Sequence, residues 1–338
     1  MSFLRKHLNN ISHNPLSTLR RFSTLTSPPI PDTPTTATSY DTLAANFATS
    51  GDFTSLHSIL NKRIQHGFFN TKHTFNFITN TNFTPSLLQN LITTLSRLNP
   101  GLTRRNAFDS LITRLCKLRR VEDALTVVQS MSRVGDIVNE LKACTFHPIL
   151  SFLTKVKSLD QAKRVVEVMS ELGVPLDLTA HNYFLMTYCY VGDVEAVVRV
   201  LKTMEEEGFC FDSRTYDALV LGACRKRDVV GAMVLVRRMV DDGVPMLYST
   251  HMFVIEALVK RDLFEQALSY VRCFSGKDKG LDCELFGCLG GKLMGMGKLK
   301  EAMLVLWEMD ERGLKMCKNV REFYDMNVGV ENDDKLLE

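Results

Sequence analysis

Apolar residues follow a helical spacing twice within each stretch of about 35 residues in the second half of the chain. Between residues 213 and 247, the first apolar stripe runs through Tyr216, Leu219, Val220 and Ala223. After a polar break, the second stripe has the same i, i+3, i+4, i+7 spacing, through Ala232, Leu235, Val236 and Met239. Each stripe places one apolar face on an amphipathic helix. The pattern therefore predicts two short helices joined by a tight turn.

This two-helix pattern recurs in register along the chain. A methionine marks the same place in the second helix of most units, and Phe274 takes that place in one of them. A glycine follows each methionine by four residues, and a small residue precedes it by seven. Three columns with one period indicate an internal repeat. The methionines are Met131, Met169, Met204, Met239 and Met309.

One helical pair cannot bury both of its apolar stripes, whereas stacked neighbours can. We therefore expect an all-α fold, a right-handed α-solenoid superhelix of ~35-residue helix-turn-helix repeats with a concave inner face. Residues 37–104 fit the pattern weakly and are expected to form two degenerate N-terminal repeats. Six repeats are expected from residue 105 onwards: 105–142, 143–177, 178–212, 213–247, 248–282 and 283–317.

The polar residues at the predicted helix ends suit this reading. Asp228 is placed to cap the second helix of its repeat. Ser158 has Gln161 three residues later, which is the spacing of a capping box. The repeating glycine after the second helix suits a left-handed backbone conformation.

A helical hairpin of this length resembles the pentatricopeptide repeat, and three stretches support the resemblance. Residues 215–224 (TYDALVLGAC) resemble the family's first helix, and residues 111–124 (LITRLCKLRRVEDA) resemble the end of that helix and its turn. Residues 297–313 (GKLKEAMLVLWEMDERG) resemble the second helix. The resemblance covers residues 37–317 and is strongest from 105. It is to the P-type organellar members, which have no C-terminal catalytic extension.

The resemblance implies binding of single-stranded RNA in organelles, with one base read per repeat. In the family, the fifth and the last residue of a repeat read the base edge. Here only Asn182 with Asp212 matches a common base-reading pair, which the family pattern assigns to uracil. Other repeats place Met252 or Gly287 at the fifth position, where neither side chain offers polar groups to a base.

Cations recur at the thirteenth position of the repeats, where the first helix ends. A row of cations at a fixed step matches the phosphate backbone of a single strand. The alternative is that basic residues simply complement the helix dipole at these ends. The chain has a formal net charge of only +3, so RNA binding would depend on this local placement of charge. The four cations are Lys117, Lys155, Arg225 and Lys260.

The two ends of the chain differ from the repeats. Residues 1–36 lack acidic residues before Asp32, and residues 1–22 contain four basic ones, which is typical of a mitochondrial transit peptide followed by a linker. The sequence before Ser23 resembles a processing site, with cleavage after Phe22. A polar tail without targeting function is the alternative, and a plastid address is less favoured. Residues 318–338 are expected to form an acidic, solvated tail.

Nothing in the sequence indicates catalysis or a bound cofactor. The nine cysteines show no zinc-binding spacing, and Cys116, Cys189 and Cys224 share one apolar repeat position that suits core packing. The glycine-rich stretch 291–298 lacks the spacing of a phosphate-binding loop. No apolar run is long enough to span a bilayer. We therefore expect no enzyme, no metal, no cofactor and no membrane partner.

Three functions remain open at this point, each for a protein expected to be a monomer. The first is an organellar protein that binds single-stranded RNA and acts in RNA processing, stability or translation. The second is a structural component of the mitochondrial ribosome, which suits degenerate base-reading positions and a small net charge. The third is a protein–protein interaction scaffold, which would not need a cation in every repeat.

Overall fold

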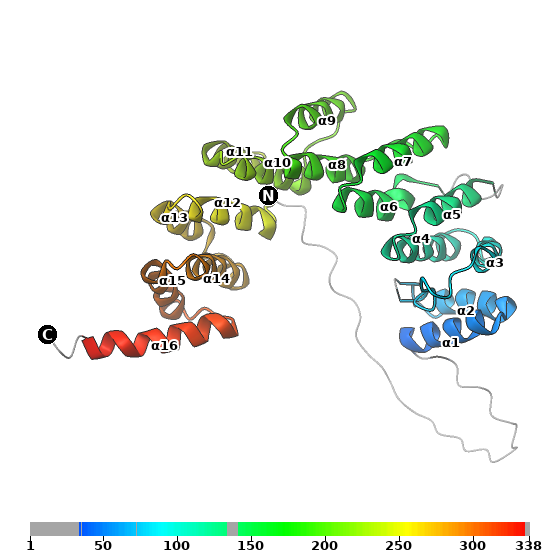
Figure 1. The fold of residues 1–338 in the computed structure, drawn as a ribbon, viewed down its shortest axis with the longest axis horizontal. Coiled ribbons are helices and arrows are strands. Elements are labelled where there is room, and N and C mark those ends of the chain that lie inside the picture. The colour runs from blue at the N-terminus through cyan, green and yellow to red at the C-terminus, as the bar shows by residue number, and fades with distance from the viewer. Residues whose placement is uncertain (1–33, 35, 72, 134–140, 335–338) are drawn as a thin grey trace, which may run out of the picture.

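The computed structural model describes residues 34, 36–71, 73–133 and 141–334, and these residues form helices without any β-strand. Seven helical hairpins and two single helices follow one another along an arc (Figure 1). The predicted transit peptide, with its expected cleavage after Phe22, and the repeat glycine Gly135 lie outside the described residues. Within the described residues, the all-α solenoid is confirmed.

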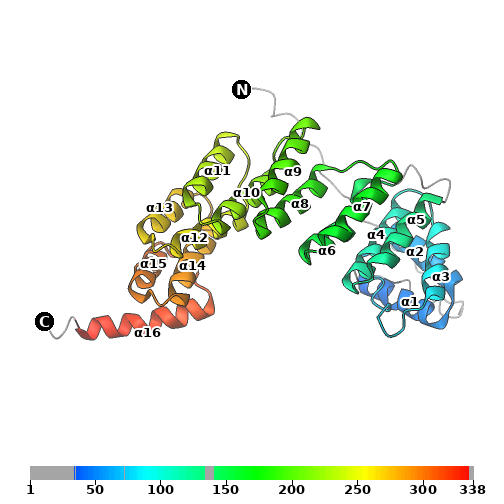
Figure 2. The ribbon, with the colours of Figure 1, turned by 45° about the horizontal axis from the view of Figure 1, so that its top comes forward.

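From α4 to α14, the first helices of the hairpins contact one another from one repeat to the next, and the first helices line the inner side of the arc (Figures 1 and 2). The second helices lie on its outer side (Figure 1). The first helices are α1 (Ala37–Ser50), α4 (Leu102–Lys117), α6 (Ala143–Lys155), α8 (Leu178–Val191), α10 (Ser213–Arg225), α12 (Tyr248–Val259) and α14 (Lys279–Gly295). The second helices are α2 (Phe53–Gln65), α5 (Val121–Arg133), α7 (Leu159–Glu171), α9 (Val194–Glu206), α11 (Val229–Asp241), α13 (Phe264–Phe274) and α15 (Leu299–Glu311).

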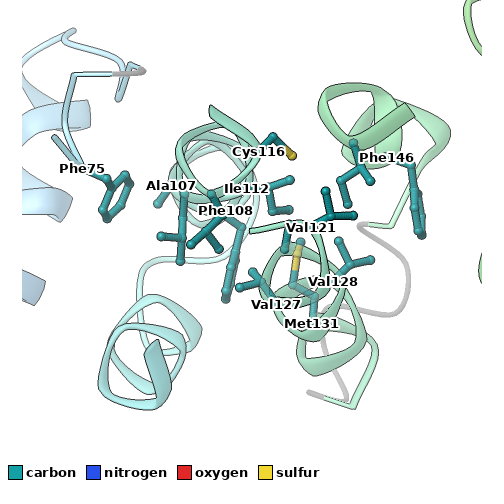
Figure 3. Close-up of a cluster of buried hydrophobic side chains, with 14 of the residues drawn as sticks. Phe75, Ala107, Phe108, Ile112, Cys116, Val121, Val127, Val128, Met131 and Phe146 are labelled. Atoms are coloured by element: carbon teal, nitrogen blue, oxygen red, sulfur yellow. The ribbon is translucent and has the colours of Figure 1, made fainter. Parts of the chain in front are cut away.

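The repeating methionines and small residues form the core between the layers. All five methionines are at most 1% exposed. Figure 3 shows Met131 beside Val127 and Val128 of α5, with Phe108 of α4 and Phe146 of α6 completing the cluster. The sequence columns therefore marked the buried contacts between neighbouring hairpins.

Left-handed backbone conformations close the hairpins at two points. The predicted glycine after the second helix has positive φ in the described repeats, for example 68° at Gly173 and 75° at Gly208. The turn inside each hairpin also contains one residue with positive φ. This residue is glycine at 51, 192 and 297. At the other four turns it is Arg119, Lys157, Arg227 or Asp262, with φ between 57° and 61°.

Of the two helix N-caps predicted from the sequence, the structure confirms one and contradicts the other. Asp228 caps α11 as expected, since its carboxylate accepts a hydrogen bond of 2.8 Å from the Gly231 N–H. The capping box at Ser158 was wrong. The Ser158 hydroxyl donates to Gln161 Oε1 at 2.8 Å instead, so the two side chains satisfy each other and no side-chain hydrogen bond caps α7.

Both ends of the array differ from the expected repeats. Residues 37–71 form the hairpin α1–α2, but residues 73–84 form turns and only α3 (Pro85–Ser96) follows. Pro85 begins that helix, as its fixed φ and missing N–H favour. The second degenerate unit therefore lacks a first helix.

The expected acidic tail is also corrected. Residues 318–334 form α16 (Lys318–Asp334), which packs against α14 and α15. Val320 and Tyr324 are buried there, because one face of this helix is apolar despite the acidic residues further on. No helix in the described parts of the chain has the length and apolar character needed to cross a membrane.

Candidate nucleic-acid interface

The residues at the thirteenth position of the repeats end consecutive first helices on the arc. Lys117, Lys155 and Arg225 are the last residues of α4, α6 and α10, and Lys260 directly follows α12. All four side chains are exposed. The structure therefore brings the predicted cations into one row, with one cation in each repeat from α4 to α12 except at α8. There, Tyr190 occupies the position.

Tyr190 joins the cations of the repeats on either side of it. The Arg225 guanidinium lies 4.0 Å from the centre of the Tyr190 ring, and Lys157 Nζ lies 4.3 Å from the same centre. A cation over an aromatic face is attracted by the negative potential of the ring. The row is thus continuous across α8, although its middle position has no charge of its own.

Lys260 has a carboxylate partner, which sequence reasoning missed. Its Nζ lies 2.5 Å from Glu256 Oε1, and Lys292 Nζ lies 2.6 Å from Glu256 Oε2. Hydrogen bonds from these two lysines lower the pKa of the Glu256 carboxyl. Glu256 is therefore ionised at neutral pH and offsets one of the two positive charges around it.

The proposed base-reading residues meet between α8 and the start of α10. Asn182 Nδ2 donates to Asp212 Oδ1 at 3.0 Å. The Thr215 hydroxyl donates to Asn182 Oδ1 at 2.9 Å, a contact that the sequence did not suggest. An asparagine amide offers two N–H donors and two acceptor lone pairs. After both contacts, Asn182 retains one donor and one acceptor, which complement the N–H and C=O groups on the edge of uracil.

The threonine contact recurs in the next repeat. Asp217 takes the fifth position there, and its carboxylate accepts a hydrogen bond of 2.8 Å from the Thr250 hydroxyl. Each of these contacts spans 33 residues, from the fifth position of one repeat to the third position of the next. In the sequence, these contacts could have been suggested by the threonines at the third position of two successive repeats, Thr215 and Thr250. The contacts show that the following repeat fixes the side chain at the fifth position.

Comparison with known proteins identifies the family. A family model described as pentatricopeptide repeat-containing protein matches residues 78–204 and 162–272. A mitochondrial pentatricopeptide repeat-containing protein of Arabidopsis thaliana is 42% identical over 296 residues, covering 87% of this chain and 84% of its own length. A second such Arabidopsis protein is 44% identical over 335 residues, covering 98% and 93%. The chain belongs to the pentatricopeptide repeat family.

The mitochondrial address predicted for this pentatricopeptide repeat protein agrees with both Arabidopsis relatives, which are named mitochondrial. Among solved structures, the pentatricopeptide repeat protein PPR10 from maize is 15% identical, with a TM-score of 0.49. The match covers 90% of this chain and 54% of PPR10, so the chain spans about half the length of that protein. A structure of PPR10 in complex with an 18-nt psaJ RNA element matches with a TM-score of 0.45, covering 84% of this chain and 40% of PPR10.

The three cysteines that share one repeat position in this pentatricopeptide repeat protein lie in or beside its apolar core. Cys116 and Cys189 are buried, and burial raises the pKa of each thiol to about 12. Cys224 is half-buried, and its pKa is also raised to about 12, chiefly by burial. No cluster of three or more potential metal ligands occurs among the described residues.

Proposed function

We propose that this pentatricopeptide repeat protein binds single-stranded RNA in mitochondria along the inner side of its arc. The row of cations that ends consecutive first helices supports the proposal. Lys117, Lys155, Arg225 and Lys260 would contact phosphates at a step of one repeat, which a stretched strand can follow. Family membership is consistent with this reading.

The base-reading part of the proposal concerns one position. Asn182 would face a uracil, using the donor and the acceptor that remain after its contacts with Asp212 and Thr215. The other repeats do not present a matching pair, so we propose that phosphate contacts supply most of the affinity. A protein bound in this way acts sterically. It blocks exonucleases or keeps a site free of RNA structure, and thereby serves RNA processing, stability or translation.

Charge reversal tests the row of cations. We expect the full-length protein with all four residues changed to glutamate to lose binding to a labelled single-stranded RNA of random sequence in a gel-shift assay. The matched control reverses four exposed cations on the outer helices: Lys163, Arg199, Lys202 and Arg237. Both variants have the same net charge. Equal loss of binding in the two variants, or unchanged binding in the first, would contradict the proposal.

Substitution of Asn182 tests base reading. Asn182→Leu keeps the size of the side chain but removes its donor and acceptor. We expect the preference for oligouridylate over oligocytidylate to fall by about tenfold, while binding to oligocytidylate stays nearly unchanged. The two affinities can be measured by fluorescence anisotropy. If the preference survives in Asn182→Leu, the pair does not read a base.

The process served can be determined in organelles. The tagged protein is crosslinked and immunoprecipitated from purified mitochondria, and the bound RNA is sequenced. A footprint on one or a few transcripts is expected if the protein acts in their processing, stability or translation. Reads confined to ribosomal RNA would instead support the role as a component of the mitochondrial ribosome. The absence of RNA above background would favour the protein–protein scaffold.

A further inference from the structure

A cavity of about 510 Å³ lies between α6 and α8, beside the row of cations. Its volume lies within the range of pockets that bind small ligands. Two aromatic rings and two lysines stand among its lining residues, together with Met186 and Thr187. The rings are Tyr183 and Tyr190, and the lysines are Lys155 and Lys157.

The two tyrosines are held from outside the cavity. The His147 ring meets Tyr183 edge to face, with 5.8 Å between the ring centres. Arg225 of the following repeat lies against the Tyr190 ring. Because Lys157 both lines the cavity and lies over Tyr190, its ammonium occupies the place that a planar group would take on that ring. Aromatic rings in such positions stack on nucleic-acid bases regardless of their sequence.

The charge of the cavity favours an anion. No acidic residue lines it, and Lys155 has no ion-pair partner in the described parts of the chain. Lys157 is held only by the Tyr190 ring there, a contact that can be exchanged for a phosphate at little cost. An aromatic platform beside two cations matches a base and its flanking phosphate.

The corresponding groove two repeats further on is built differently. Between α10 and α12, a cavity of about 420 Å³ is lined by Cys224, Arg227, Ala257, Lys260 and Arg261, without an aromatic ring. Arg261 there donates to the Arg227 carbonyl oxygen at 2.7 Å. Phosphates can be bound in that groove, but a base finds no ring to stack on. The pair of tyrosines that lines the cavity between α6 and α8 therefore does not recur in this groove.

We propose that the cavity between α6 and α8 holds one nucleotide of the bound RNA, turned out of the row of bases that faces the fifth positions. Its base stacks on Tyr183 and Tyr190, and its phosphate lies between Lys155 and Lys157. When the base enters, the Lys157 ammonium leaves the Tyr190 ring and turns to the phosphate. The proposal rests on the proposed function, since it requires RNA on the inner side of the arc.

This site is distinct from Asn182, the proposed base-reading residue on the same helix. Tyr190 lies eight residues after Asn182, or roughly 12 Å along α8 at 1.5 Å per residue. A stacked base is bound without regard to its identity, whereas Asn182 selects one base. The cavity therefore anchors the strand in the middle of the array and fixes which nucleotide reaches Asn182.

Ultraviolet crosslinking tests where the RNA lies. The full-length protein is crosslinked to a single-stranded RNA of random sequence, and the nucleotide-bearing residues are located by fragmentation mass spectrometry. We expect adducts at Tyr183 or Tyr190. If RNA is bound and the adducts map only to other repeats, the cavity proposal fails while the proposed function stands. If the wild-type protein binds no RNA, the proposed function itself fails.

Substitutions test the contribution of the rings. We expect Tyr190→Leu to lower RNA affinity at least about fivefold, with an unchanged salt dependence because no charge is lost. Tyr190→Phe keeps the ring and should bind like the wild type. Lys155→Gln should instead make the salt dependence shallower. Wild-type affinity in Tyr190→Leu, with helicity retained by circular dichroism, would overturn the proposal.

Competition distinguishes an RNA nucleotide from a free one. A mixture of the four 5′-nucleoside monophosphates is added at increasing concentration to the protein–RNA complex. We expect little displacement, because a single nucleotide lacks the phosphate contacts of the other repeats. Tight binding of monophosphates that blocks RNA crosslinks at Tyr183 and Tyr190 would overturn the proposal and assign the cavity to a free nucleotide.

Discussion

Single residues set the local charge of the proposed RNA path, and Glu256 is the clearest case. It binds Lys260 and Lys292 with both of its oxygens and so weakens the positive potential where the row of cations reaches α12. A carboxylate in this place repels the phosphate that Lys260 would bind. In the proposed complex, Glu256 would therefore keep the RNA affinity below what the cations alone could provide.

We predict that Glu256→Gln raises RNA affinity and steepens its salt dependence by about 0.7, the slope expected for one further phosphate contact on a single strand. Titrations at several salt concentrations measure both effects. Glu308→Gln is the matched control, since Glu308 also binds two cations, Arg272 and Arg312, but lies on the outer helix α15. Lower affinity in Glu256→Gln would show that the carboxylate positions the lysines for binding.

Another residue, His251, makes stability depend on pH. Its side chain is buried against Phe274, with Nδ1 2.9 Å from the Tyr270 hydroxyl, and burial lowers its pKa to about 4. In the unfolded chain the pKa is about 6.5, so only the unfolded state gains a proton between these values. Neutral His251 therefore contributes to the free energy of unfolding above pH 6.5. This contribution is lost as the pH falls towards 4, and the loss is roughly 3 kcal/mol at most.

The prediction is tested by urea unfolding, as the difference in the free energy of unfolding between the wild type and His251→Gln. The difference is needed because half-buried Asp109 acts in the opposite direction. Burial raises its pKa to about 6, so its contribution falls as the pH rises from about 4 to 6. We expect the stability advantage of the wild type to shrink between pH 6.5 and 4. Exposed His73→Gln is the control, and an advantage independent of pH would contradict the assignment.

At the scale of elements, sequence patterns located the hairpins well and the ends of the array poorly. The repeats from 105 onwards were predicted because their apolar columns recur in register. Helix α16 was missed because its apolar face, Val320 and Tyr324, is short and precedes a conspicuous acidic stretch. Helix α16 covers the last hairpin by packing against α14 and α15. The sequence of this helix alone does not reveal that packing.

Helix α16 is expected to protect the last hairpin from solvent. We predict that Tyr324→Ala destabilises the protein by roughly 3 kcal/mol, since it removes a buried ring. Thermal unfolding followed by circular dichroism measures the loss, and exposed Glu322→Gln on the same helix is the control. An unchanged melting temperature in Tyr324→Ala would indicate that this helix adds nothing to the folded array.

The candidate site was partly predictable for a related reason. The family pattern pointed to Asn182, Asp212 and the cations because those positions are local to one repeat or its boundary. Thr215 was missed because its partner Asn182 lies 33 residues away, on the neighbouring repeat. Glu256 lies only four residues before Lys260, but its second partner, Lys292, lies 36 residues away on the next repeat. Only the stacking of hairpins brings such residues together, so their roles could be assigned only from the structure.

At the scale of the whole molecule, the proposed function makes the array a distributed binding surface. Four phosphate contacts on a single strand predict that log K falls with log salt concentration with a slope of about −3. The wild-type protein should show this slope in titrations with single-stranded RNA, and the fourfold charge-reversal variant should show almost none. A slope near zero in the wild type would exclude phosphate contacts as the main source of affinity.

The positive φ angles inside the hairpins have a consequence for how stability is distributed. Glycine adopts this conformation freely, whereas other residues lose roughly 1–2 kcal/mol there. Three hairpins nevertheless place Arg119, Lys157 or Arg227 at the turn, where Gly192 and Gly297 show that glycine is accepted. The folded array thus forgoes several kcal/mol at these turns, so glycine in place of Arg119, Lys157 or Arg227 offers a direct way to raise its stability.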